Sequence, residues 1–408
     1  VASPMSKTIL IISTLDTKGE ETLYLQGKIA SLGLDTLMMD LSMRGGKESP
    51  AEITPAMVAK AGGSTLEALG ASRERSQITA ITIAGAIKLA AQYHAAGKVG
   101  GVVALGGSTG SLMASEVMRA LPFGLPKVII SSTAALPGLS TRYIGTGDIM
   151  LFHSVIEISG VSNLLKNVID RAAGALMGMV NSDVASPVAD NNHAIAMTML
   201  GPCEQCAHSV RRGLEKSGYQ VTGFSAAGIS DRAMEEMITR GFFKGVIELA
   251  PGGVGEHLFG YMRDAGPTRM EAAGRAGIPQ IISLCSVNHM TPAKSKYKPD
   301  FNTRRKYDLD KFRTWIRLAP VELEQVADAF AQKLNTAKGP VIVIVPLKGW
   351  SGVDIPGNPT YDPKEDAVFT HRLQEKLSDG IEIREIDANM EEEAVARAVI
   401  AAAIEIMP

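Results

Sequence analysis

Strand-like apolar runs alternate with helical patterns along the chain, and this alternation restricts the fold more than any other feature. In the first half the runs are "KTILIIS", "DTLMMDL", "GGVVAL" and "KVIISS". In the second half they are "HAIAMTML", "QVTGFS", "FKGVIELA", "PQIISLC", "GPVIVIVP" and "GIEIREID". Such alternation is typical of parallel sheets covered by helices. We therefore predict an α/β fold with two doubly wound, Rossmann-like domains and a cleft between them.

The length of the chain also indicates more than one domain. At roughly 150 residues per domain, 408 residues suggest two or three. The stretch "NSDVASPVADNN" at 181–192 has the composition of a linker, and the strand pattern restarts after it. We place an N-terminal α/β domain at 1–187 and a C-terminal α/β domain at 188–408. Ligands of open parallel sheets bind beyond the carboxyl ends of the strands, and often between domains.

Composition and charge exclude several classes of protein. Apolar residues make up 45% and charged residues 21%, as in a soluble globular protein with a sizeable core. The formal charge of −2 gives no global attraction to nucleic acid or to an anionic membrane. The run "VIVIV" at 341–345 is far shorter than the roughly 20 residues of a spanning helix. Three cysteines, an odd number, argue against a disulfide framework and predict a cytoplasmic location.

The segment "LGGSTGSLMASEV" at 105–117 is the strongest local signal for a ligand. A strand ends there, glycines allow the backbone to approach a ligand, and hydroxyl side chains precede a helix whose N–H groups and positive dipole end favour anions. The segment is neither a Walker A loop nor a complete G-x-G-x-x-G, and a tight turn with a serine cap is the simpler alternative. The predicted phosphate-binding residues are Gly106, Gly107, Ser108, Thr109, Gly110 and Ser111.

A second turn from strand to helix, "STLDTKGEE" at 13–21, combines an acid, hydroxyls, a lysine and a glycine. Asp16 and Thr17 suit a helix N-cap, and the two glutamates that follow would repel a phosphate placed on the helix axis. We therefore interpret the turn as a flank of the phosphate site. Lys18 would supply positive charge, and Asp16 would act through magnesium.

Two further loops of the first half follow the same design. "ISSTAALPG" at 130–138 offers the hydroxyls of Ser132 and Thr133 after a strand. In "RYIGTGDIM" at 142–150, Gly147 precedes Asp148. An aspartate after glycines could hold a metal or a ribose hydroxyl, or it could cap the next helix.

The second half carries two candidate loops for another ligand. "LAPGGVGEHLFG" at 249–260 ends a strand in glycines and contains a titratable Glu-His pair, although a lone histidine is more often structural. "VPLKGWSGVDIPGNPTYD" at 345–362 is a long loop of the kind that is usually functional or part of an interface. The predicted second-ligand residues are Gly252, Gly253, Gly255, Glu256, His257, Lys348, Gly349, Ser351 and Asp354.

The segment 291–317 has nine lysines or arginines against three aspartates, with five aromatic residues among them. Basic residues interleaved with aromatic ones can bind single-stranded nucleic acid. An oligomerisation arm or a lid is the favoured alternative, because the rest of the chain is neutral and no nucleic-acid motif accompanies the segment. Of these we prefer the arm.

Seven motifs together resemble one family, the ATP-binding domain family of the tomato mosaic virus resistance protein. They are "LDTKGEE", "DLSMRGG", "ALGGSTGS", "STAALPG", "IGTGDIM", "APGGVGEHLFG" and "PLKGWSGVDIPGNP". Their order covers essentially the whole chain. The resemblance implies a two-domain α/β protein that binds ATP in or near the cleft of its first domain and self-associates. In the plant relative the domain resembles an inhibitor of viral RNA replication and is fused to a TIM barrel, so a separate TIM-barrel partner is implied here.

These observations lead to the hypothesis of an ATP-binding protein, with magnesium held by Asp16 or Asp148. An enzyme of this kind would transfer a phosphoryl or nucleotidyl group to an unidentified small, carboxylate-type metabolite. The candidates for catalysis are Lys18, Asp148, His257 and Lys348. The alternative is a non-catalytic nucleotide-sensing module that regulates a partner protein. Both hypotheses predict a homo-oligomer, with neither a membrane nor a nucleic acid as partner.

Overall fold

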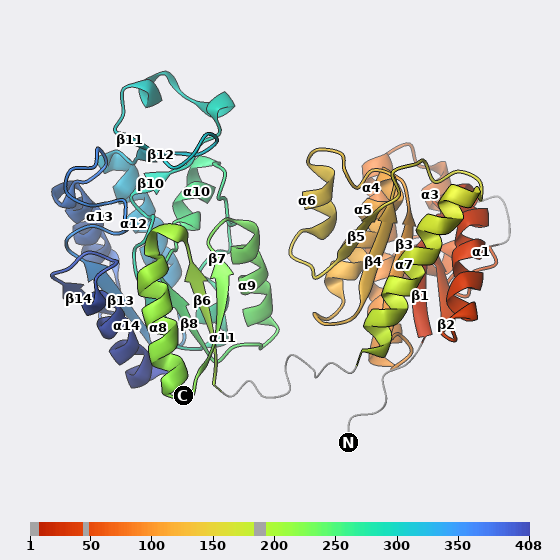
Figure 1. Cartoon of the computed structure of the whole chain (residues 1–408), viewed down its shortest axis with the longest axis horizontal. Coiled ribbons are helices and arrows are strands. Elements are labelled where there is room, and N and C mark those ends of the chain that lie inside the picture. The colour runs from red at the N-terminus through yellow and green to blue at the C-terminus, as the bar shows by residue number, and fades with distance from the viewer. Residues whose placement is uncertain (1–7, 44–48, 183–192) are drawn as a thin grey trace. The chain divides into compact units, whose positions relative to one another are not determined.

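The computed structural model describes residues 8–43, 49–182 and 193–408, and the chain divides into two compact units, 1–187 and 188–408 (Figure 1). Of the predicted linker, residues 183–192 lie outside the described residues. In the described residues no helix is long and apolar enough to cross a bilayer.

The N-terminal domain is built on a five-stranded parallel sheet with the order β2-β1-β3-β4-β5. The strands are β1 (Thr8–Ser13), β2 (Asp35–Asp40), β3 (Gly101–Gly106), β4 (Lys127–Ser131) and β5 (Met150–His153). The first four confirm the runs predicted from the sequence, whereas β5 was not predicted. The chain passes from β1 to β2 on one side and then to β3 on the other, so the order reverses at β1.

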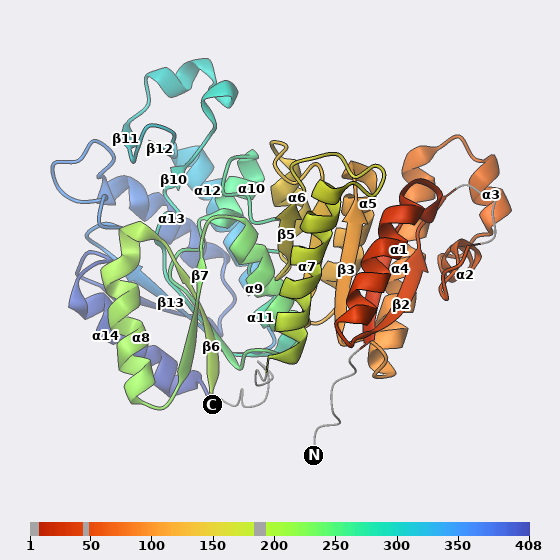
Figure 2. The ribbon, with the colours of Figure 1, turned by 45° about the vertical axis from the view of Figure 1, so that its right-hand side comes forward.

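Helices cover both faces of this sheet. They are α1 (Leu15–Ser31), α2 (Pro55–Ala61), α3 (Leu66–Ala71), α4 (Arg75–Ala95), α5 (Ser108–Ala120), α6 (Leu139–Ile144) and α7 (Asn163–Asn181). Helices α1 and α7 lie on one face (Figure 2), while α2, α4, α5 and α6 pack on the other. Along β1, Ile9 and Ile11 contact the first group and Leu10 and Ile12 the second. The run is apolar throughout because both faces are buried.

The C-terminal domain repeats this winding with six parallel strands in the order β14-β13-β9-β8-β6-β7. They are β6 (Ala194–Met199), β7 (Gln220–Ser225), β8 (Gly245–Glu248), β9 (Gln280–Ile282), β13 (Val341–Pro346) and β14 (Glu382–Ile386). All six confirm predicted runs. The second strand again lies on one side of the first and the later strands on the other, so the order reverses at β6.

Two layers of helices cover the second sheet. Helices α8 (Glu204–Lys216) and α14 (Glu393–Ile406) pack on one face. The other face carries α9 (Ile229–Thr239), α10 (Gly253–Phe259), α11 (Ala272–Ala276), α12 (Pro320–Leu334) and α13 (Pro363–Lys376). The three cysteines, Cys203, Cys206 and Cys285, are unpaired and buried in the first of these layers. Both domains therefore have the predicted doubly wound, Rossmann-like architecture.

The segment 291–317, with the two residues before it, contains a small antiparallel sheet that the sequence analysis did not predict. Its strands are β10 (His289–Met290), β11 (Lys306–Asp308) and β12 (Thr314–Arg317), with β12 in the centre. Figure 1 shows this sheet at one end of the C-terminal domain. Phe301 and Trp315 belong to the core, so part of the aromatic pattern reflects packing and not an exposed arm.

The four arginines of this segment are engaged in ion pairs within the domain. The pairs are Arg304 with Glu322, Arg305 with Asp362 and Glu365, Arg313 with Asp310, and Arg317 with Asp366. Because their charges are matched locally, much of the apparent basic excess is not available to a nucleic-acid backbone.

Two helix glycines of the N-terminal domain provide a test of its packing. A Cβ atom at Gly85 in α4 would lie 2.0 Å from the carbonyl oxygen of Val58, whereas one at Gly174 in α7 would meet nothing within 4 Å. Gly85→Ala should destabilise the domain by about 1–3 kcal/mol through overpacking. Gly174→Ala should instead stabilise it by about 0.5–1 kcal/mol.

Calorimetry of the full chain measures both effects, and tryptophan fluorescence supplies an internal control. Both tryptophans, Trp315 and Trp350, lie in the C-terminal domain. The fluorescence transition should therefore stay at its wild-type position in both variants. A wild-type calorimetric profile for Gly85→Ala would show that α2 and α4 are not in the close contact described here.

Candidate functional site

A pocket of about 740 Å³ lies at the carboxyl ends of the neighbouring strands β1 and β3. The strand order of the N-terminal sheet reverses at the first of these strands. Three segments contribute most of the lining of the pocket. They are the turn at 14–18 after β1, the stretch 69–78 from the end of α3 to the start of α4, and residues 107–110 after β3. The structure thus brings together Asp16, Thr17 and Lys18 with the glycine-rich turn, as the sequence predicted. A volume of this size is typical of small-molecule sites.

The first turn of α5 leaves its backbone donors open toward this pocket. Gly107 is the N-cap, and the amide of Ser111 donates to its carbonyl oxygen at 3.0 Å. The amides of residues 108–110 have no acceptor within the helix, and the first turn contains no acidic residue. A Cβ atom at Gly110 would meet nothing within 4 Å. These are the conditions under which a helix terminus binds an anion.

Asp40, at the end of β2, holds the neighbouring turn in place. Its carboxylate accepts hydrogen bonds from the amides of Leu15 at 3.1 Å and Ser42 at 2.9 Å. The amide of Asp16 donates to the Ser42 hydroxyl at 3.1 Å. Thr14 is the N-cap of α1, so the prediction of Asp16 or Thr17 as the cap was wrong. Sequence reasoning overlooked Asp40, although an acid that ends a strand was a visible signal.

The positive charges of the pocket come from Lys18 and from two arginines that the sequence analysis missed. Lys18 Nζ donates to the carbonyl oxygen of Ile158 and lies 3.8 Å from Glu157. Arg73 and Arg75 line the pocket, and Arg75 Nη2 is 3.4 Å from Thr109 Oγ1. Arg73 lies in the short connection before α4 and Arg75 begins that helix, without glycine-rich or motif character, so only the fold shows their relation to the site.

Four predicted phosphate-site residues do not line this pocket. Gly106 ends β3, and the Ser111 hydroxyl donates to Ser131 Oγ at 2.8 Å in the interior. Ser132 donates to Glu157 at 3.2 Å, and Thr133 Oγ1 lies 2.6 Å from the Tyr143 hydroxyl. These side-chain hydroxyl groups form hydrogen bonds between neighbouring segments of the domain.

Asp148, together with Gly147, lies at the opposite edge of the sheet, and its predicted place beside the phosphate site is wrong. Its carboxylate contacts Lys127 Nζ at 2.6 Å and the amide of Gly124 at 2.7 Å. Lys127 begins β4. Asp148 precedes β5 and therefore lies at the amino ends of the strands. The error arose because β5 was not recognised, so that the aspartate was read as following a strand.

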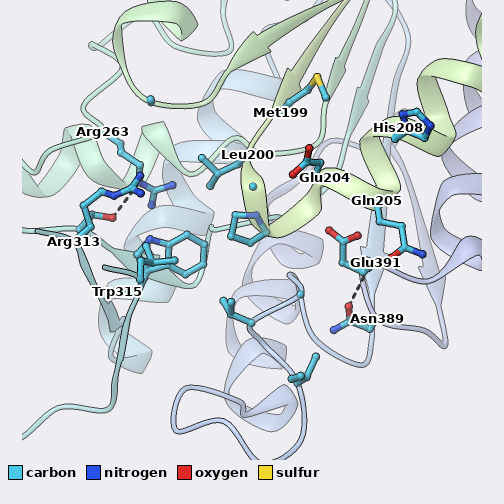
Figure 3. Close-up of a pocket in the computed structure, with 18 of the residues that line it drawn as sticks. Met199, Leu200, Glu204, Gln205, His208, Arg263, Arg313, Trp315, Asn389 and Glu391 are labelled. Carbon is cyan, nitrogen blue, oxygen red and sulfur yellow. Dashed lines mark hydrogen bonds between the residues drawn. The ribbon is translucent and has the colours of Figure 1, made fainter. Parts of the chain in front are cut away.

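A second and larger pocket, of about 1300 Å³, lies at the carboxyl ends of β6, β7, β13 and β14 in the C-terminal domain (Figure 3). Residues of the loops after these strands line it, among them Leu200, Gly352 and Glu391, and Arg313 and Trp315 come from the start of β12 and the residue before it. None of the predicted second-ligand residues lines it, although residues adjacent to them do. This pocket also lies at the strand where its sheet reverses, β6.

Comparisons with known proteins agree with this two-domain description. Residues 7–185 match the N-terminal domain and residues 192–407 the C-terminal domain of the uncharacterised protein family UPF0261. The chain belongs to the UPF0261 family. A UPF0261 protein of Clostridium tetani is 32% identical over 405 residues, which cover 99% of this chain and 100% of that protein.

Relatives of this UPF0261 chain include bacterial and plant proteins. A UPF0261 protein of Brucella suis is 32% identical over 94% of this chain and 92% of its own length. The ToMV resistance protein Tm-1(GCR237) of Solanum lycopersicum is 32% identical over 76% of this chain, which is 42% of that longer protein. The family that the seven sequence motifs resemble is thereby confirmed.

In the loop at 249–260 of this UPF0261 chain, glycines and charged side chains serve the packing of the fold. A Cβ atom at Gly252 would lie 2.4 Å from the Ser286 carbonyl oxygen, and Cβ atoms at Gly253 and Gly255 would also meet close neighbours. Buried Glu256 pairs with Arg263 at 2.8 Å. Nδ1 of His257 lies 2.9 Å from the carboxylate of Asp264, and His257 does not line the large pocket. The predicted residues affected are Gly252, Gly253, Gly255, Glu256 and His257.

The predicted residues of the loop at 345–362 likewise serve the fold. Lys348 pairs with Asp387 at 2.9 Å on the surface, and Gly349 has a φ of +107° in close contact with the carbonyl oxygen of Asp354. The Asp354 carboxylate is buried and accepts hydrogen bonds from the Trp350 amide and the Asn288 side chain, both at 2.9 Å. The Ser351 side chain is fully buried.

Asp354 belongs to a buried ionic cluster whose stability should depend on pH. Asn288 Nδ2 donates to both Asp354 and Asp366, and Arg317 pairs with Asp366. Burial raises the pKa of Asp366 to about 7, from 3.8, against the opposing charge of Arg317. The folded state therefore keeps a proton that the unfolded chain loses, and the associated stability, fully present below pH 3.8, is lost as the pH rises through about 7.

We expect the free energy of unfolding of the C-terminal domain to fall between about pH 4 and pH 7 because of this group. Asp366→Asn should reduce the slope of the free energy of unfolding against pH. Part of the slope should remain, because the pKa of buried Asp231 is also raised, to about 6. Urea unfolding followed by tryptophan fluorescence reports on this domain alone. The exposed Asp379→Asn is the matched control. An unchanged slope in Asp366→Asn would contradict the assignment.

Proposed function

We propose that the N-terminal domain binds ATP through its phosphates, together with Mg²⁺. The observation that carries the proposal is the pocket at the carboxyl ends of β1 and β3. It combines the acid-free amino terminus of α5 with Lys18, Arg73 and Arg75. Backbone amides and cations that converge on one cavity favour a ligand with several negative charges. The motif resemblance identifies that ligand class as ATP.

The residues present are compatible with a magnesium ion carried by the nucleotide. In the described residues no group of three or more His, Cys, Asp or Glu side chains could hold a metal. Mg²⁺ usually needs only one or two carboxylates beside phosphates and water. Asp16 is the acid of the pocket, and its carboxylate accepts no hydrogen bond from the described residues. Asp16 would therefore hold the ion, and Asp148 would not.

The same lining favours binding over catalysis. The pocket contains no histidine, cysteine or glutamate among its described residues. Its lysine, Lys18, already donates to the Ile158 carbonyl. Asp16 is assigned to the magnesium ion, so the described lining offers no further side chain as a general base for phosphoryl transfer. We accordingly favour a nucleotide-sensing module that regulates a partner over an ATP-consuming enzyme. The partner implied by the motif resemblance is a separate TIM-barrel enzyme.

Removal of the two arginines should weaken ATP binding. Each arginine that contacts a phosphate contributes about 1.5–3 kcal/mol, so Arg73→Ala and Arg75→Ala should each raise the Kd of Mg-ATP at least about tenfold. Gly107→Val should weaken binding as well, because its new methyl groups would project over the open amides of α5. A Cβ atom at Gly107 is 3.9 Å from Ser132 Oγ, its nearest neighbour, so the fold should tolerate the change.

Isothermal titration of the full chain measures these affinities. Lys88→Ala, on α4 but outside the pocket, is the matched control and should bind as the wild type does. Adenosine should bind far more weakly than ATP, because the phosphates supply most of the contacts. ATP binding that survives all three substitutions would place the nucleotide elsewhere, and no heat at millimolar Mg-ATP would exclude the function.

A further inference from the structure

In the pocket of the C-terminal domain, two glutamates lie opposite two of its three arginines. Figure 3 shows Glu204 and Glu391 on one side and Arg263 and Arg313 on the other, with Leu200 and Trp315 among the side chains between them. Its exposed lining is predominantly apolar, and Met199, Met262 and Ile355 contribute to it. The pocket is therefore suited to an organic ligand with an apolar body.

Three arginines line the pocket, and all have acidic partners within the domain. Arg211, on α8, lies 3.9 Å from Glu215. Buried Arg263 donates to Glu256 and also to Thr291 at 3.1 Å. It also lies over the Trp315 ring, 5.5 Å from its centroid. Arg313 pairs with Asp310 at 2.6 Å. Because these charges are compensated, this side of the pocket provides little attraction for an anion.

The two glutamates have no such compensation. Glu391 accepts a hydrogen bond from the amide of Cys206 at 3.2 Å, which fixes it at the amino terminus of α8. Glu204 begins the same helix and is exposed. Burial raises the pKa of Glu391, and the charged residue that adds to this effect is Glu204. Within the described part of the chain, neither carboxylate has a salt-bridge partner.

We propose that this pocket binds a small organic cation, a primary amine on an apolar or aromatic body, whose ammonium group lies between Glu204 and Glu391. An ammonium group would relieve the repulsion between the two carboxylates, and the body would contact Leu200, Met262 and Trp315. A metal ion is a poorer fit, because the described residues offer no group of three or more metal-ligating side chains. This proposal is independent of nucleotide binding in the other domain.

Three probes with the same phenyl body and different charge test the proposal: 2-phenylethylamine, 2-phenylethanol and 3-phenylpropionate. Ligand-observed NMR and isothermal titration on the full chain measure their affinities. The amine should bind at least about tenfold more tightly than the alcohol, a difference of about 1.4 kcal/mol, because only the amine carries a charge opposite to that of the glutamates. The carboxylate should bind most weakly.

Glu204→Gln and Glu391→Gln remove the charge and retain the shape. Each should weaken amine binding severalfold, and the double variant should bind the amine no better than the alcohol. Glu204 is exposed, so its single variant tests the proposal without a risk to folding, and circular dichroism checks the fold of the other variants. Glu324→Gln, an exposed glutamate of α12 outside the pocket, should bind as the wild type does.

Several outcomes would overturn the proposal. The first is binding of 3-phenylpropionate that is as tight as that of the amine, or tighter. The second is amine binding that the folded double variant retains in full. The third is no saturable binding of the amine at millimolar concentration. Loss of amine binding in Glu324→Gln would show a non-specific charge effect and would also contradict it.

Discussion

The reversal of strand order at the first strand of each sheet is the constraint on which both pockets depend. At β1 and again at β6 the chain leaves in one direction and later returns to the other side of the same strand. The loops that follow neighbouring strands therefore diverge at the carboxyl edge and leave space between them. Each domain carries its pocket at this place, independently of the other.

The strands could be predicted because a parallel sheet buried on both faces demands continuous apolar runs such as Ile9 to Ile12. The failures are equally physical. The strand β5, at the edge of the sheet, was not recognised in the sequence, and its omission placed Asp148 at the wrong edge of the sheet. Arg73 and Arg75 approach the α5 terminus only after the chain has folded, so no local pattern could reveal them.

Glycine-rich loops were an unreliable guide because close approach of the backbone has two different causes. At Gly110 a Cβ atom would meet open space, and the residue borders a cavity. At Gly252 a Cβ atom would collide with the carbonyl oxygen of Ser286, so glycine is required there by packing alone. The sequence does not distinguish a backbone that a ligand approaches from one that another loop approaches.

The two pockets differ in charge although the two sheets share one winding, so their ligand preference resides in the loops. In the N-terminal domain the start of α5 has no acid, and cations surround its open amides. In the C-terminal domain the pocket borders the start of a different helix, α8, which follows the first strand of its sheet, and the carboxylate of Glu391 lies there. A helix terminus that already holds an internal carboxylate is closed to a phosphate, since the amides are used and the local charge is negative. A helix start at the carboxyl edge of a sheet is thus suited to an anion in the one proposed site and to a cation in the other.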